Sequence, residues 1–132
     1  MKFYQPVHFQ LHEYIHPECL KIYGEKSIWF MDPRILWTMD GIRNLYGCRV
    51  FINRDDMTER GLRPFGHGMS EHFFGKATDF DVDNYPAETI RHEIINNPDE
   101  GVFKYITGIE LNVPWVHIDC RNYNGLLQFK RG

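Results

Sequence analysis

The sequence predicts an α+β fold, because two stretches have the hydrophobic period of a helix and several short runs are rich in strand-forming residues. The expected helices span residues 33–46 and 86–97, and the expected strands span residues 48–53, 77–82, 102–111 and 115–121, with a short edge strand at 126–129. Consecutive strands joined by short turns pair antiparallel. We therefore expect a small antiparallel sheet with both helices on one face and a cleft on the other.

The helix expected at residues 33–46 has the clearest boundaries. Asp32 can cap its free N–H groups, and Pro33 occupies the first helical position, where a missing donor has no effect. Gly47 can take the left-handed conformation that ends a helix. An apolar stripe recurs with the helical period and consists of Ile35, Leu36, Met39, Ile42, Leu45 and Tyr46. This stripe predicts a helix that packs on the sheet.

The composition indicates one globular domain over residues 1–132, with residues 1–29 as an N-terminal extension whose structure the sequence does not define. Hydrophobic residues make up 42% of the chain and aromatic residues 15%, which favours a packed core over disorder. The net charge of −3 gives no basic face of the kind that nucleic-acid binders carry. No apolar run is long enough to span a membrane. We expect a monomer with neither nucleic acid nor a membrane as partner.

The N-terminus lacks the continuous apolar segment of a signal peptide. Three cysteines without close spacing favour reduced thiols over a disulfide framework. Both observations predict synthesis in a reducing cytoplasm.

Two histidines and an aspartate have a spacing that suits a metal site. His72 and Asp79 are seven residues apart, and His117 lies on a distant predicted strand. Three protein ligands leave a fourth coordination position open, which is typical of catalytic rather than structural zinc. Between the first two ligands, Gly75 allows a sharp turn and Ala77 leaves the strand surface uncrowded. This spacing allows a Zn²⁺ site in the cleft on the face of the sheet opposite the helices, but two unrelated histidines and an aspartate are also common in a chain of this size.

The residues around these ligands form two motifs. The motifs are S-x-H-x-x-G-x-A-x-D, with Ser70, His72, Gly75, Ala77 and Asp79, and W-x-H-x-D, with Trp115, His117 and Asp119. The pattern resembles zinc peptidase family M15, which contains D-alanyl-D-alanine carboxypeptidases, dipeptidases and phage peptidoglycan endopeptidases. The likeness is closest to small single-domain members of phages and prophages. It implies the fold shared with Hedgehog signalling domains, and zinc on the two histidines and the aspartate.

The resemblance also implies residues that bind the substrate. Gly61-Leu62-Arg63 looks like the segment in which the family places an arginine for a substrate carboxylate, although a solvated loop charge is the alternative for Arg63. Ser70 and Trp115 hold motif positions that imply substrate contacts.

The sequence departs from the family at the general base. Many members carry an acidic residue three positions before the last histidine, where this chain has Pro114. Glu110 is the favoured substitute, because it sits across the expected hairpin within reach of the metal site. Asp119 is the alternative, either as base or as a carboxylate that hydrogen-bonds to His117.

Taken together, these features predict a zinc-dependent peptidase that hydrolyses peptidoglycan stem peptides, at a bond involving a D-amino acid. With no signal peptide visible, it would reach the cell wall through phage lysis or a virion. The alternatives are a non-catalytic zinc-binding module and a phage structural protein that binds cell wall or a protein partner.

Overall fold

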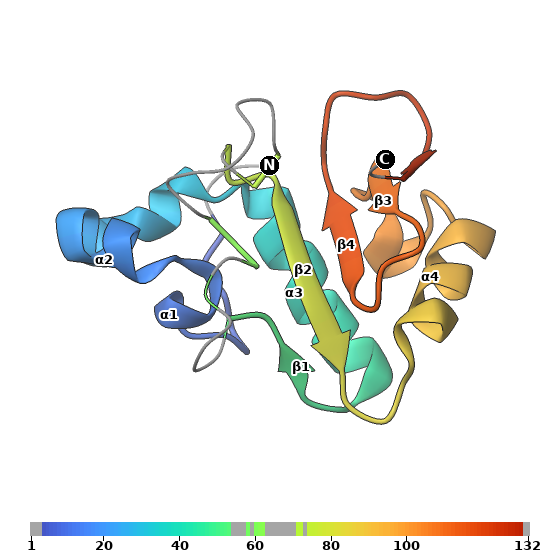
Figure 1. Cartoon of the computed structure of the whole chain (residues 1–132), viewed down its shortest axis with the longest axis horizontal. Coiled ribbons are helices and arrows are strands. Elements are labelled where there is room, and N and C mark those ends of the chain that lie inside the picture. Colours follow the sequence, from blue (N-terminus) through green and yellow to red (C-terminus); the bar gives the residue numbers. More distant parts are fainter. Residues whose placement is uncertain (1–3, 54–57, 59, 63–70, 73, 131–132) are drawn as a thin grey trace.

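The computed structural model describes residues 4–53, 58, 60–62, 71–72 and 74–130. Its elements are α1 (Leu11–Tyr14), α2 (Pro17–Tyr23), η1 (Gly24–Phe30), α3 (Pro33–Tyr46), β1 (Val50–Phe51), β2 (Ala77–Val82), α4 (Ala87–Asn96), η2 (Gly101–Phe103), β3 (Gly108–Glu110), β4 (Val116–Asp119) and β5 (Leu127–Phe129), where η denotes a 3-10 helix. In Figure 1, α3 runs behind β2, and α4 lies to the right of β4 and contacts it. The predicted α+β class is confirmed. The strand expected at 48–53 is reduced to β1.

The five strands form one mixed sheet in the order β1-β2-β4-β3-β5. Three neighbouring pairs are antiparallel, but β3 and β5 run parallel, so the expectation of a purely antiparallel sheet was wrong. The reason is topological. Both edges of β4 are already paired with β2 and β3, so the strand that follows β4 adds to the free edge of β3 instead. It runs antiparallel to β4, which makes it parallel to β3.

The strand expected at 102–111 was also wrong over its first half. Gly101 has a φ of +52°, and the chain there forms η2 and a turn. Phe103 and Ile106 are both buried, and this three-residue spacing fits a helical turn rather than the two-residue alternation of a strand. Only β3 remains of the expected strand.

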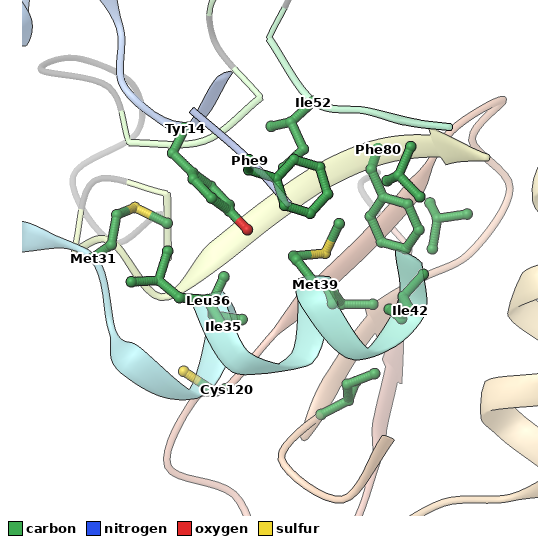
Figure 2. Close-up of a cluster of buried hydrophobic side chains, with 14 of the residues drawn as sticks. Phe9, Tyr14, Met31, Ile35, Leu36, Met39, Ile42, Ile52, Phe80 and Cys120 are labelled. Atoms are coloured by element: carbon green, nitrogen blue, oxygen red, sulfur yellow. The ribbon is translucent and has the colours of Figure 1, made fainter. Parts of the chain in front are cut away.

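The core lies between α3 and the sheet, as Figure 2 shows. Asp32 caps α3 as expected, by accepting a hydrogen bond from the backbone N–H of Arg34 at 2.9 Å. Gly47 ends the helix with a φ of +64°. The apolar stripe of α3 faces Phe80 of β2, which is fully buried. Leu45 departs from the expected stripe, because it is 54% exposed in the last turn of the helix.

The N-terminal residues are part of this core. Tyr14 and Ile15 are fully buried, and Figure 2 places Tyr14 among the side chains of α3 and β2. Ile15 forms a parallel bridge with Leu62, and the backbone N–H of Asn53 donates to the carbonyl of Glu13 at 2.9 Å. The described part of the expected extension therefore packs against segments that lie far along the chain. Among the described helices, none is both long and apolar enough for a membrane span.

Candidate metal centre

The sheet places the predicted ligands side by side. Asp79 of β2 is paired directly with His117 of β4. Directly paired residues of antiparallel strands share one face of the sheet, with Cβ atoms about 5 Å apart. Ile109 pairs with Ile118, and the same register places Glu110 of β3 across from His117 on its other side. One row of side chains on one face thus carries an aspartate, a histidine and a glutamate.

The third predicted ligand, His72, comes from the turn that leads into β2. The backbone N–H of Gly75 donates to the carbonyl of His72 at 3.1 Å, and Gly75 has a φ of +70°. A Cβ at this glycine would overlap the carbonyl oxygen of Phe30. The sharp turn expected from the sequence is confirmed, and it brings the imidazole of His72 back over Asp79.

The three side chains form a compact donor set. Asp79 Oδ1 lies 2.8 Å from His117 Nδ1 and 3.3 Å from His72 Nε2. One ligand atom from each residue lies within 4.8 Å of the other two. A tetrahedral zinc ion with bonds of about 2.0–2.1 Å separates its ligand atoms by about 3.3 Å. The trio could therefore hold a metal ion.

The outer nitrogen of each histidine has a hydrogen-bond acceptor. His72 Nδ1 lies 3.1 Å from the carbonyl oxygen of Gly61, and His117 Nε2 lies 2.9 Å from Asp119 Oδ2. These oxygens can only accept, so the outer nitrogen of each ring carries a proton. Asp79 Oδ1 also only accepts, and a cation bound beside it would replace the proton on the inner nitrogen of His117. The inner nitrogens, which face Asp79, would then present lone pairs to that cation. Metal-binding histidines in proteins are commonly oriented in this way.

The carbonyl of Gly61 is held in place by the N-terminal segment. The backbone N–H of Leu62 donates to the carbonyl of Tyr14 at 2.7 Å, and that of His16 donates back to the carbonyl of Leu62 at 2.9 Å. A Cβ at Gly61 would overlap the carbonyl oxygen of Tyr14, so only glycine allows the two backbones to approach this closely. The orientation of His72 thus depends on residues more than fifty positions earlier in the chain.

The carboxylate of Asp119 occupies a space between two small residues. Asp119 pairs with Ala77 on one side and with Gly108 on the other, and a Cβ at Gly108 would overlap its carboxylate. The side chain is fully buried and forms an ion pair with Arg121. Burial raises the pKa of Asp119, but the hydrogen bonds to Arg121 and His117 outweigh it and bring the pKa to about 2. Asp119 is therefore a charged, buried support for His117.

The electrostatics of the trio favour a cation. Burial raises the pKa of Asp79, but its hydrogen bonds to His117 and His72 outweigh that effect and hold the pKa well below its ordinary value. Burial lowers the pKa of His117, yet the carboxylates of Asp119 and Asp79 raise it to about 9. The site thus concentrates negative charge around one ring, and a metal ion would take the place of the inner proton of that ring.

The other predicted residues have different outcomes. Glu110 is 3% exposed, in the row described above. Trp115 is half-buried, and its indole Nε1 is buried without a hydrogen-bond partner in the described part of the chain. Arg63 and Ser70 lie outside the described residues, so their expected substrate contacts stay predictions.

Sequence reasoning offered Asp119 as a carboxylate that hydrogen-bonds to His117, but it missed Arg121, the partner of Asp119, and the carbonyl of Gly61 beside His72. Arg121 has a signal in the sequence, because His117, Asp119 and Arg121 alternate with the period of a strand and share one face. The pairing of Gly61 with Tyr14 has no local signal, because it joins distant segments.

Comparison of the chain with protein-family models, curated proteins and solved structures gives no match.

Proposed function

We propose that the chain is a zinc-dependent peptidase that hydrolyses peptidoglycan stem peptides, at a bond involving a D-amino acid. The observation that carries the proposal is the trio of His72, Asp79 and His117, in which both histidines have their outer nitrogens engaged. A peptide substrate is proposed from the resemblance of the two motifs to zinc peptidases of family M15. Bound zinc would supply a Lewis acid for the peptide carbonyl and for the attacking water.

The residues of this chain have separate roles in the proposed reaction. His72, Asp79 and His117 hold the ion. Glu110 is the proposed general base, because the register that sets it beside His117 puts it on the face of the sheet where the trio would hold the metal. It accepts a proton from the attacking water and returns it to the leaving amine. Asp119 suits this role less well, because its oxygens accept from Arg121 and His117.

The test compares hydrolysis of purified peptidoglycan by the wild type, Glu110→Gln and the control Glu100→Gln. Glu100 is exposed and lies next to η2, away from the trio. We expect the wild type and Glu100→Gln to release stem-peptide fragments, and Glu110→Gln to keep its zinc but lose about 100-fold or more in rate, the contribution typical of a general base. Full activity in Glu110→Gln would contradict the assignment of the base.

A non-catalytic zinc-binding module is the second candidate. The burial of both acids near the trio favours it, since Glu110 is 3% exposed and Asp119 is fully buried. If the wild type binds one zinc ion and releases no fragments from several wall types, this second function replaces the first.

A further inference from the structure

Arg121 follows β4 and faces Asp119 with two parallel hydrogen bonds. Its Nε donates to Oδ1 at 2.7 Å, and its Nη2 donates to Oδ2 at 2.6 Å. The same Oδ2 accepts from Nε2 of His117 at 2.9 Å. A single carboxylate oxygen therefore joins the guanidinium to the ring that would hold the metal.

The burial of Asp119 makes this pairing necessary. The aspartate side chain is fully buried, whereas that of Arg121 is 26% exposed. A buried carboxylate that loses its cation carries an uncompensated charge and gains by moving toward water. Any such movement would withdraw Oδ2 from His117.

Arg121 is itself fixed by a neighbouring strand. Its guanidinium carbon lies 4.5 Å from the ring centroid of Phe129 in β5, a distance that fits a cation–π contact. The same phenyl ring meets the imidazole of His117 edge-on, with centroids 5.6 Å apart. Phe129 thus contacts both Arg121 and His117. Gly108 leaves space for the carboxylate of Asp119 that joins them.

We propose that Arg121 is a positioning residue for the metal ligand His117 and acts through Asp119. It holds the aspartate where the outer nitrogen of the imidazole donates, so that the inner nitrogen is directed at the ion. The inference rests on the metal centre of the proposed function, but not on the peptide cleavage assigned to that centre.

The chain offers a matched control. Arg34 also makes two hydrogen bonds to an aspartate two residues away, from Nε to Asp32 Oδ1 at 3.0 Å and from Nη2 to Asp32 Oδ2 at 2.8 Å. That aspartate caps α3 rather than supporting a ligand. Arg34→Gln therefore removes the same kind of pair from an aspartate whose side chain has no hydrogen bond to the histidines of the trio in the described part of the chain. Arg34 also lies against Cys120, between Asp119 and Arg121, so the variant controls for disturbance of that segment as well.

The experiment measures Zn²⁺ affinity by competition with a chelator and follows the imidazole N–H signals by NMR, in the wild type, Arg121→Gln, Arg121→Lys and Arg34→Gln. We expect Arg121→Gln to weaken zinc binding about tenfold, the lower end of the loss typical when an outer partner of a ligand is removed. Arg121→Lys keeps the positive charge but cannot form the two parallel hydrogen bonds, so its zinc affinity should lie between those of the wild type and Arg121→Gln. Arg34→Gln should bind zinc like the wild type.

NMR separates positioning from general damage to the fold. In Arg121→Gln the Nε2–H signal of His117 should move while the Nδ1–H signal of His72 stays in place, because the latter donates to a backbone carbonyl. Wild-type affinity with an unmoved His117 signal would overturn the proposal, and so would an equal loss in Arg34→Gln. If the wild type binds no zinc, the metal centre fails. In that case the His117 N–H signal of metal-free Arg121→Gln is compared with that of the metal-free wild type. An unchanged signal contradicts the positioning role of Arg121.

Discussion

The two histidines of the candidate metal centre are oriented by different kinds of partner. His72 donates to the backbone carbonyl of Gly61, whereas His117 donates to the side chain of Asp119. The first support is created by packing between distant segments, and the second by side chains on neighbouring strands. A side-chain support can be adjusted by single substitutions, but a backbone support changes only when the chain around it moves. The two halves of the site should therefore respond differently to mutation.

The largest effect is expected from removing either histidine, because both are proposed to bind the metal directly. Loss of an outer hydrogen-bond partner lowers metal affinity by about 10–100-fold. His72→Ala and His117→Ala each remove a proposed ligand, so the zinc affinity of each variant should fall by more than that. The measurement is zinc bound per chain after dialysis, with circular dichroism to check the fold. His92→Ala serves as control, because His92 is exposed on α4. Stoichiometric zinc in either ligand variant would contradict the ligand assignment.

Gly61→Ala tests the backbone support. The added methyl group would overlap the carbonyl oxygen of Tyr14, so one of the two backbones must shift. We expect unfolding free energy to fall by about 1–3 kcal/mol, as for other overpacked sites, and zinc affinity to fall with it. Chemical denaturation of the metal-free protein, followed by zinc titration, measures both. A variant that loses stability but keeps full affinity would show that His72 does not need the carbonyl of Gly61.

Asp119→Asn tests the side-chain support with little change in shape. The amide oxygen can still accept from His117, but the charge that pairs with Arg121 is lost. Zinc affinity should fall about 10–100-fold. Chelator competition gives the affinity, and NMR should show the N–H signal of His72 unchanged. A shift of both imidazole signals would mean that the two supports are not independent.

Gly108→Ala should have the smallest effect of the four. Its methyl group would meet the carboxylate of Asp119, which is a side chain and can move further than a backbone carbonyl can. We expect about a tenfold loss of zinc affinity, because Asp119 is displaced from His117 rather than removed. Gly101→Ala is the control for chelator competition. Its φ of +52° strains an alanine, but a Cβ there meets no atom within 4 Å, so the variant shows what backbone strain alone does to zinc affinity. If Gly108→Ala and Gly101→Ala bind zinc equally well, a methyl group at Gly108 does not displace Asp119 from His117.

The parts of the fold that the sequence predicts well are those with local signals. Asp32, Pro33 and Gly47 set the boundaries of α3, and the structure matches them. The two-residue period of β2 places Asp79 on the face opposite Phe80, so this candidate ligand lies outside the core.

The parts that the sequence predicts poorly depend on long-range pairing. The parallel addition of β5 follows from the occupied edges of β4, which no local pattern encodes. The same holds for the contact of Gly61 with Tyr14, since a glycine in a loop does not reveal what approaches it. Among the supports of the site, the alternation of Asp119 and Arg121 after His117 is therefore the one that sequence patterning can reach.

The measurement that tests the central claim most directly is the zinc content of the purified wild type and of His117→Ala, determined by elemental analysis after dialysis against metal-free buffer. The account predicts one zinc ion per wild-type chain and none in the variant, with circular dichroism showing a folded protein in both. A folded wild type that holds no zinc after zinc addition would contradict the account, as would a variant that holds as much zinc as the wild type.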